Sequence, residues 1–351
     1  MEISLCMIVK NEEAVLGRCL DSVKELVDEI VIVDTGSIDS TREIAARYTE
    51  KVYGFEWIDD FAAARNYAFS KGTKEYLMWL DADDILENRE EFLKLKAAAD
   101  GSIDTYMLRY DVGFDENGSP IASFYRERIM RRCRHAVWEG AVHETVKPFG
   151  KIVRTDVAVS HRKMGRGDPD RNLRILEKQL HFGRNFGARE KFYYARELMW
   201  HGRYEEAEKY FNDFLSDKDG FLPNKIDACR DLSSCHAHTG KDSIEPLLLA
   251  LTYGSPCSEI CCDLGRYFFE KTDYKSAIFW YKNALENDAS LSPCFQNPDC
   301  HGFLPCIQLC VCYYRLNDNE TAKKYNDLAG EYKPNDKSYL FNLNFFNSVE
   351  K

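Results

Sequence analysis

The sequence has no long hydrophobic run and no excess of positive charge. Its first residues, MEISLCMIVKNEE, hold an apolar run of about eight residues with no basic segment before it, too short for a signal peptide or a membrane span. Lys and Arg number 47 against 58 Asp and Glu, a formal net charge of −11, whereas binding to a phosphate backbone depends on excess basic side chains. These absences predict a cytoplasmic protein that binds no nucleic acid and spans no membrane.

Cysteine is abundant, but the Cys-x2-Cys pair typical of zinc sites is missing among the 13 cysteines. The chain is long, the number is odd and no export signal precedes them, which disfavours a disulfide framework. We expect reduced thiols packed in helices, because free cysteine is among the most buried residue types. A zinc site remains the alternative, with candidate ligands Cys294, Cys300, His301, Cys306, Cys310 and Cys312.

Hydrophobic periodicity divides the 351 residues into two parts, in keeping with the length at which single cores stop growing. Up to about residue 160, apolar runs alternate with segments of helical period, and Ser40 and Asp60 occupy N-cap positions. The alternation predicts parallel strands with helices on both faces, and a hairpin makes the sheet mixed and Rossmann-like. The predicted strands are 3–10, 29–34, 51–55, 75–81, 104–114, 120–130 and 151–161, and the predicted helices are 12–25, 40–48 and 60–71.

Beyond about residue 170 the strand signals vanish. Segments 192–215 and 264–286 both show helical spacing around a turn, and Tyr274 lies 70 residues after Tyr204. That interval is about twice the 34-residue tetratricopeptide period, which predicts a further unit around Gly240 and a fourth at 306–329. We therefore expect an α/β domain at 1–170 and a tetratricopeptide-like helical domain at 171–351. Such a helical stack either binds a peptide or a second copy on its concave surface, or only stabilises the first domain.

Polar residues collect where the predicted strands end, the edge at which parallel sheets bind ligands. Three carboxylates within four positions follow the fourth strand, and they would repel one another unless a cation lay between them. Oxygen ligands favour Mg²⁺ or Mn²⁺ over zinc, with water and substrate phosphates completing the shell. Helix capping is the alternative role for two of the carboxylates, Asp83 and Asp84. The strand-end residues are Asn11, Glu12, Asp34, Asp39, Asp81, Asp83 and Asp84.

The motifs MIVKNEE, VDTGSIDST and WLDADD follow one another at the first, second and fourth strands. In this order they resemble the family 2 nucleotide-sugar glycosyltransferases of the GT-A fold, over roughly residues 1–165. The resemblance implies that the nucleoside is held by Asn11 or Glu12 and by Asp34, with Asp39 a further candidate. It also implies that Asp81, with Ala82 beside it, contacts the nucleotide sugar and that Asp83 contacts the metal.

Three further residues become candidates through the resemblance. Arg65 lies in the segment that closes over the nucleotide and would contact phosphate or ribose, whereas an ion pair with Asp59 or Asp60 is its alternative role. His161 ends the last strand, where metal-dependent members use a late histidine as a metal ligand. Arg166, in the Gly-rich and basic loop that follows, would carry positive charge to the diphosphate.

The segment VWEGAVHETV supplies candidates for the acceptor side of the site. Inverting sugar transfer needs a carboxylate that removes the acceptor's proton, and we select Glu144 first and Glu139 second. Trp138 could stack on a sugar, although an aromatic residue at this spacing is more often part of the core. This segment departs from the better-known members, whose base lies in a Glu-Asp pair.

Together these features predict a metal-dependent inverting glycosyltransferase with a helical repeat domain, similar to the sublancin-type peptide S-glycosyltransferases. The resemblance implies a UDP-sugar donor, hexosyl or N-acetylhexosaminyl transfer, and a peptide Cys or Ser acceptor held by the helical domain, which could instead form a homodimer. The alternatives are a surface polysaccharide or lipid-linked acceptor, and a repeat scaffold whose transferase domain is inactive. A nucleotidyltransferase would need a Gly-rich phosphate loop, which KNEEAVLG is not.

Overall fold

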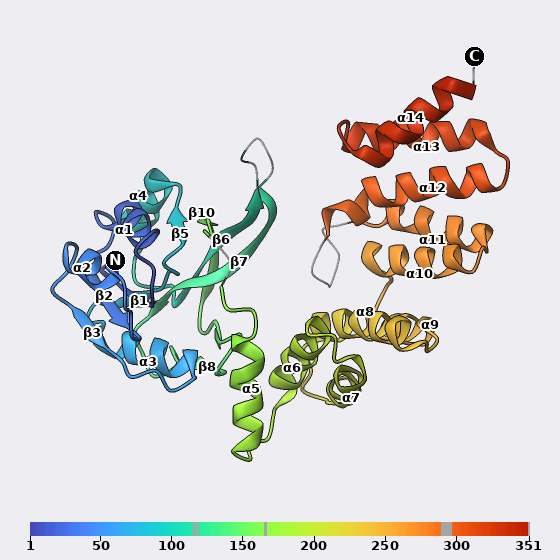
Figure 1. Ribbon diagram of the computed structural model, residues 1–351. Coiled ribbons are helices and arrows are strands. Elements are labelled where there is room, and N and C mark those ends of the chain that lie inside the picture. Colours follow the sequence, from blue (N-terminus) through green and yellow to red (C-terminus); the bar gives the residue numbers. More distant parts are fainter. Residues whose placement is uncertain (115–117, 119, 165–166, 289–296, 350–351) are drawn as a thin grey trace. The chain divides into compact units, whose positions relative to one another are not determined.

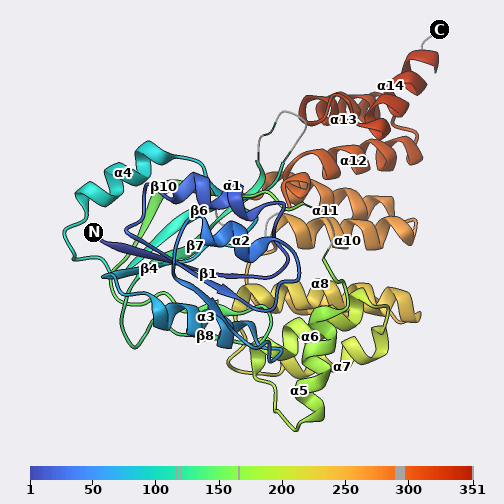
Figure 2. The ribbon, with the colours of Figure 1, turned by 60° about the vertical axis from the view of Figure 1, so that its left-hand side comes forward.

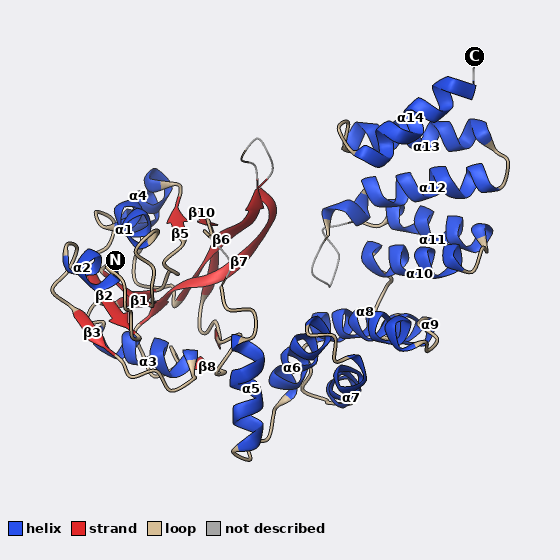
Figure 3. Cartoon of the chain, viewed as in Figure 1, coloured by secondary structure: helices blue, strands red, loops and turns tan. Residues whose placement is uncertain are grey.

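The computed structural model describes the chain except residues 115–117, 119, 165–166, 289–296 and 350–351 (Figure 1). The chain divides into two compact units, Met1–Gly183 and Arg184–Lys351. The first unit contains the whole sheet, and its last helix is α5 (Arg171–His181). The second unit consists of helices (Figure 3). Within the described part of the chain, every helix is too short or too polar to cross a lipid bilayer.

The sheet of the first unit is mixed, with strand order β3-β2-β1-β4-β7-β6-β10-β5. Neighbours β3, β2, β1 and β4 run parallel, as do β6 and β10, while β7 is antiparallel to β4 and β6, and β5 to β10. The predicted mixed α/β sheet is confirmed. The strands are β1 (Ile3–Val9), β2 (Glu29–Asp34), β3 (Val52–Gly54), β4 (Tyr76–Met78), β5 (Asp84–Leu86), β6 (Thr105–Phe114), β7 (Pro120–Arg131) and β10 (Ile152–His161).

The alternation of side chains along β1 places core residues on both faces of the sheet. Leu5 and Met7 pack with residues of α1 (Leu16–Val23), whereas Cys6 packs with residues of α3 (Phe61–Lys71). Figure 2 shows these two helices on opposite sides of the sheet. Each fully buried aliphatic side chain contributes about 1.5–3 kcal/mol, so both layers stabilise the strand that carries the first candidate motif.

The helices of this unit follow the predicted order but differ from it in detail. Asp60 accepts a hydrogen bond from Ala63 N–H at 2.9 Å and so caps α3, as expected, whereas Ser40 precedes α2 (Thr41–Ala46) without a side-chain capping bond. Four elements were not predicted because each is short or lies between stronger signals: β5, α4 (Arg89–Ala98), β8 (Trp138–Glu139) and β9 (Thr145–Val146).

The second unit is a stack of antiparallel helix pairs followed by one more helix. The predicted tetratricopeptide-like units are confirmed, and their inter-helix turns share a left-handed residue: Gly202 (φ 73°), Gly240 (φ 73°), Thr272 (φ 60°) and Asn317 (φ 62°). A Cβ at Gly265 would lie 2.7 Å from the Tyr281 ring, so that helix pair packs closely. The helices are α6 (Ala188–Trp200), α7 (Tyr204–Leu215), α8 (Leu222–Thr239), α9 (Ile244–Ala250), α10 (Ser258–Glu270), α11 (Tyr274–Glu286), α12 (Phe303–Arg315), α13 (Asn319–Tyr332) and α14 (Lys337–Val349).

The cysteines that the structure describes are free thiols, and all of them except Cys133 are buried. This agrees with the expectation of reduced thiols inside helices. Of the zinc candidates, Cys294 lies outside the described residues, while Cys300, Cys306, Cys310 and Cys312 pack in the cores of the helical unit.

Candidate active site

The loops after β1 and β2 are joined by hydrogen bonds, so the first two motifs form one structure. Asn11, at φ 55°, donates its N–H to Ser37 Oγ at 3.0 Å and accepts from Ile38 N–H through Oδ1 at 2.9 Å. Asp39 accepts from Glu13 N–H at 3.2 Å, which adds a third link. These contacts bring the predicted nucleoside-binding residues to one edge of the sheet, although Asn11 and Asp39 also hold the loops together.

Asp34, at the end of β2, is almost completely buried, and its carboxylate faces the loop that follows. Oδ1 accepts hydrogen bonds from Gly36 N–H and Ser37 N–H, both at 3.1 Å. Arg42 Nη1 lies 3.6 Å from the same oxygen. In this state the carboxylate therefore shapes the loop at the predicted nucleoside site.

Glu12 lies close to the carboxylates that follow β4. Its pKa is raised to about 7, first by burial and then by the negative charges of Asp83, Asp81 and Asp39. Crowded like charges of this kind favour a bound cation, because a cation lowers the cost of ionising every member.

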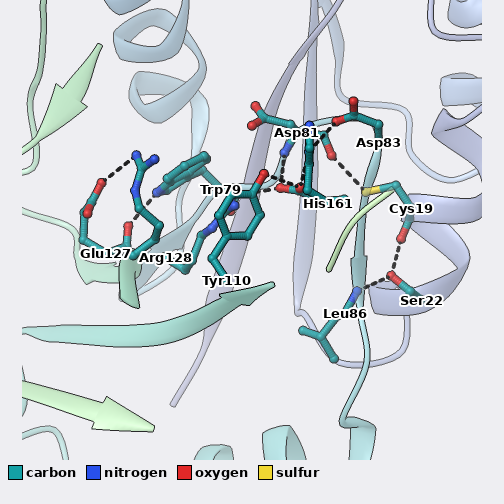
Figure 4. Close-up of polar contacts among 12 residues, drawn as sticks. Cys19, Ser22, Trp79, Asp81, Asp83, Leu86, Tyr110, Glu127, Arg128 and His161 are labelled. Carbon is teal, nitrogen blue, oxygen red and sulfur yellow. Dashed lines mark hydrogen bonds and ion pairs between the residues drawn. The ribbon is translucent and has the colours of Figure 1, made fainter. Parts of the chain in front are cut away.

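Asp83 and His161 form the open side of a possible metal site (Figure 4). His161 Nδ1 lies 3.4 Å from Asp83 Oδ1, and their side chains are 30% and 20% exposed. Burial and the neighbouring Asp81 and Asp84 raise the pKa of Asp83 despite the opposing effect of His161. A hydrogen bond to Asp84 raises the pKa of His161. Among the described residues, one group of three Asp, Glu, Cys or His side chains has ligand atoms that all lie within 4.8 Å of one another. Its members are Asp83, Asp84 and His161.

This donor set fits a hard divalent cation such as Mg²⁺ or Mn²⁺, which binds carboxylate oxygen and tolerates imidazole. The partial exposure of Asp83 and His161 leaves room for water and phosphate oxygens. His161 ends a strand predicted from sequence, whereas Asp83 follows a predicted strand. The unpredicted strand β5 brings the two residues together, because Asp84 pairs in register with His161 across the β5–β10 ladder.

Asp84 is fully buried beneath this group. Its Oδ2 lies 3.0 Å from Arg128 Nη1 and accepts from Asp81 N–H at 2.9 Å. Its Oδ1 accepts from Tyr110 OH at 3.1 Å and lies 3.3 Å from His161 Nδ1. Asp84 thus joins the candidate metal group to the sheet interior.

Arg65 connects the predicted nucleotide side of the site to the predicted acceptor side. Its Nη2 donates to Asp81 Oδ1 and its Nε donates to Glu144 Oε1, both at 2.7 Å. The two carboxylates raise the pKa of Arg65, although burial opposes them, and Arg65 and Arg128 lower the pKa of Asp81 to about 2, also against burial. The sequence alternative paired Arg65 with Asp59 or Asp60, but Asp60 caps α3 and Asp59 pairs with Lys178.

Two tryptophans form the surroundings of the Arg65 guanidinium. Its carbon lies 5.0 Å from the Trp79 ring centroid and 4.8 Å from the Trp138 ring centroid. Trp138 is only 2% exposed and packs edge-on against Trp79, so it belongs to the core beneath the site. Asn66, next to Arg65, donates to Trp138 O at 2.9 Å and accepts from its N–H at 2.8 Å, which fixes β8 on α3.

The two candidate bases differ in their surroundings. Glu144 is 13% exposed and bonded to Arg65, whereas Glu139 is 60% exposed and pairs with Lys147 at 3.0 Å. Only Glu144 of these two is joined to the Asp81 carboxylate through Arg65. Ala82 is buried between the two aspartates of the motif. Arg166 lies outside the described residues.

Sequence reasoning missed Arg128 and Tyr110, which lie on the hairpin strands and reach under the aspartates of the WLDADD motif. Arg128 is completely buried and stacks on Trp79 and Tyr110, with its guanidinium carbon 3.7 Å and 4.4 Å from the ring centroids. The signal that could have identified Arg128 was the third carboxylate, Asp84, because a buried carboxylate needs a cationic or hydrogen-bonding partner.

Comparison with known proteins agrees with the strand-end motifs. Residues 4–146 match the model of Glycosyl transferase family 2. The SPbeta prophage-derived glycosyltransferase SunS of Bacillus subtilis is 27% identical over 227 residues, which cover 60% of this chain and 52% of that protein. The lipopolysaccharide core biosynthesis glycosyltransferase LpsC of Rhizobium meliloti is 27% identical over 161 residues, covering 43% of this chain and 59% of that protein.

Other similarities extend to repeat proteins and solved structures. A TPR repeat-containing protein of Synechococcus elongatus is 48% identical over 85 residues, which cover 24% of this chain and 21% of that protein. The crystal structure of S. aureus TarS 1-349 in complex with UDP-GlcNAc has 17% identity and a TM-score of 0.40, covering 72% of this chain and 91% of that one. The chain spans less than two thirds of the length of the curated relatives named here. From the family match and the architecture of the two units, residues 4–146 belong to a family 2 glycosyltransferase domain of the GT-A fold, and a tetratricopeptide-like helical region follows it.

Proposed function

We propose that the chain is a metal-dependent, inverting glycosyltransferase that moves a sugar from a UDP-sugar to a Cys or Ser side chain of a peptide. The observation that supports this most is the connection made by Arg65. One guanidinium holds Asp81, at the predicted donor side, and Glu144, at the predicted acceptor side. A transferase needs these two sides next to each other, because the acceptor must attack the sugar carbon while the nucleotide leaves.

On the donor side, Asn11, Glu12, Asp34 and Asp39 surround the nucleoside, and Asp81 accepts hydrogen bonds from ribose hydroxyls. Asp83 and His161 hold the divalent cation. When bound, that cation neutralises the negative charge that develops on the departing diphosphate. By the resemblance of the motifs, Arg166 would add positive charge to the diphosphate.

On the acceptor side, Glu144 takes the proton of the attacking thiol or hydroxyl. Arg65 binds its Oε1 and so orients the carboxylate, which leaves Oε2 to receive the proton. The Trp79 and Trp138 rings, which pack against each other and both contact the Arg65 guanidinium, limit its movement. Glu139, which is open to solvent, is the second candidate for this role.

A peptide acceptor is favoured by the helical region, because stacked helix pairs form extended concave surfaces. The same region could join two copies into a homodimer. Free thiols, including exposed Cys133, fit a reducing compartment such as the cytoplasm. A glycan acceptor is the second candidate, since one relative is named for lipopolysaccharide core biosynthesis.

The test is to incubate the chain with Mn²⁺ or Mg²⁺ and a panel of UDP-hexoses and UDP-N-acetylhexosamines, and to measure free UDP with Cys peptides, Ser peptides or lipid-linked glycans. Metal-dependent UDP release that increases with a peptide is the expected result. Stimulation by a glycan alone would move the acceptor to the second candidate. If no nucleotide sugar is bound or turned over, the helical scaffold with an inactive transferase domain becomes the better explanation.

A further inference from the structure

Asp84 has the chemistry of a metal ligand but not the freedom of one. Its two oxygens receive the Asp81 N–H, the Tyr110 hydroxyl, the Arg128 guanidinium and the His161 ring. A carboxylate offers about four lone-pair sites, so these four partners occupy its acceptor capacity. Its side chain is 0% exposed, whereas Asp83 and His161 reach solvent.

Arg128 further separates Asp84 from the ion. Its Nη1 lies 3.0 Å from Asp84 Oδ2, and both side chains are completely buried. A divalent ion bound directly to Asp84 would therefore lie close to a buried guanidinium, where like charges repel strongly. The stacking of Arg128 on Trp79 and Tyr110, together with its bond to Trp79 O at 3.3 Å, holds that guanidinium in place.

The contact with His161 indicates that Asp84 orients the histidine ring. An ion-paired carboxylate only accepts hydrogen bonds, so a neutral His161 ring that bonds Asp84 Oδ1 at 3.3 Å does so through a proton on Nδ1, which also lies 3.4 Å from Asp83 Oδ1. Donation from one ring nitrogen fixes the tautomer and leaves the other nitrogen as the ligand atom. The same carboxylate accepts from Asp81 N–H at 2.9 Å, so it also fixes the start of the Asp81–Asp83 turn relative to the histidine.

We propose that Asp84 is a positioning residue and not a metal ligand: neutralised by Arg128, it orients His161 so that Nε2 is the nitrogen left to bind the cation with Asp83. Arg128 acts through Asp84 and is a positioning residue of the same kind. This inference rests on the proposed metal-dependent function and assigns separate roles to the three members of the candidate metal group.

The test has one readout without metal and one with it. In the full chain labelled with ¹⁵N-histidine, NMR at a pH where the ring is neutral should show His161 protonated at Nδ1. The signal is assigned by its loss in His161→Gln among the eight histidines of the chain. The variant Asp84→Ala/Arg128→Met removes both buried charges together, and it should lose the preference for the Nδ1–H tautomer. Asp84→Leu/Arg128→Met, which also leaves no acceptor at position 84, is the second variant if that pair does not fold.

Mn²⁺ binding in the presence of UDP then separates the roles. Loss of an outer-shell partner typically weakens metal binding about 10–100-fold, so we expect that loss in both Asp84 variants, whereas Asp83→Asn should abolish binding. Equal abolition in the Asp83 and Asp84 variants would make Asp84 a ligand and overturn the proposal, as would an unchanged tautomer. If the wild-type chain binds no Mn²⁺ but the tautomer changes as expected, the metal-dependent function fails while the orientation of His161 by Asp84 holds.

Discussion

Asp81 and Glu144 lie on different segments of the transferase domain, yet each accepts a 2.7 Å hydrogen bond from Arg65. Their spacing is thus set by the width of a single guanidinium. Because that group is planar and presents its donors in a fixed fork, the two carboxylates are held in one orientation relative to each other.

Arg65→Lys should therefore reduce kcat strongly while leaving the fold intact. Lysine keeps the charge but cannot donate in two directions from a planar group, so one of the two carboxylates loses its bond. We expect a loss on the order of 10²-fold in kcat, as is typical when a positioned charge pair shifts by about 1 Å. Initial rates of UDP release measure the loss in kcat, and circular dichroism checks that the fold is intact. Arg42→Lys, which changes an exposed arginine at the same sheet edge, is the control variant.

Glu144→Gln and Glu139→Gln should differ in their effect on turnover. Removing a general base typically costs 10²–10⁴-fold, and we expect a loss of about that size for Glu144→Gln with little change in the Kd for UDP-sugar. Glu139→Gln should remain within about twofold of the wild type, since a surface ion pair contributes little. The reverse order of effects would assign the base to Glu139.

The affinity for Mn²⁺ should increase as pH rises through about 7. Burial and the neighbouring carboxylates raise the pKa of Glu12 to about 7, so this group is mostly protonated below that pH and ionised above it. A cation at Asp83 favours the ionised form of Glu12. If the bound cation lowers the pKa of Glu12 by one unit, the affinity for Mn²⁺ changes about tenfold between the protonated and ionised forms. Calorimetric titration at pH 6 and pH 8 measures the slope. Glu12→Gln should reduce this slope and leave the part that comes from His161, whereas Glu43→Gln, an exposed change on α2, should not alter it.

The helical region should be stabilised by Asp227→Asn at high pH. Burial raises the pKa of Asp227 to about 6, with Asp231 adding to the shift against the nearby Arg230. An unfolded aspartate titrates near about 3.9, so ionisation costs the folded state nothing at low pH and destabilises it as pH rises from about 4 to 6.

We therefore expect Asp227→Asn to raise the free energy of unfolding by about 1–3 kcal/mol at pH 8, with the gain disappearing near pH 4. Urea unfolding followed by circular dichroism at several pH values gives this comparison. Asp213→Asn, an exposed change on α7, should show no such pH dependence. A gain that is equal at both ends of the pH range would contradict the raised pKa.

Gly265→Ala should destabilise the third helix pair. Its Cβ would lie 2.7 Å from the Tyr281 ring, which is itself buried, so the ring or the helix must move. Overpacking of this kind costs about 1–3 kcal/mol in the free energy of unfolding. Gly254→Ala is the matched control, because its Cβ would enter open space. Comparison of the urea midpoints of the two variants decides whether the contact with Tyr281, and not the added methyl group itself, causes the loss of stability.

Much of the fold follows from periodicity. The apolar run at 29–34 coincides with β2, because a strand that is buried on both faces is nearly continuously apolar. The interval between Tyr204 and Tyr274, about twice the repeat length, predicted where the helix pairs lie. Strand β5 escaped prediction because only three residues pair, and they pair with β10, more than 60 residues later.

The site was less predictable, since its contacts depend on which strands are neighbours. Asp84 meets Arg128 because β4 lies beside β7, and a strand order of that kind leaves no local trace in the sequence. Arg65 is a similar case: its position was a candidate from the motif order, but its two partners come from loops 16 and 79 residues away.

The left-handed turns of the helix pairs bear on how such a domain can be rebuilt. Glycine occupies two of these turns, while Thr272 and Asn317 adopt the same conformation in the other two. Glycine and asparagine favour this conformation, but the β-branched Thr272 does not, so packing between its helices, and not the turn residue, must determine that hairpin. We therefore expect the helix pair around Thr272 to tolerate duplication or exchange as a module, because each pair contacts mainly its neighbours and this one does not depend on its turn residue.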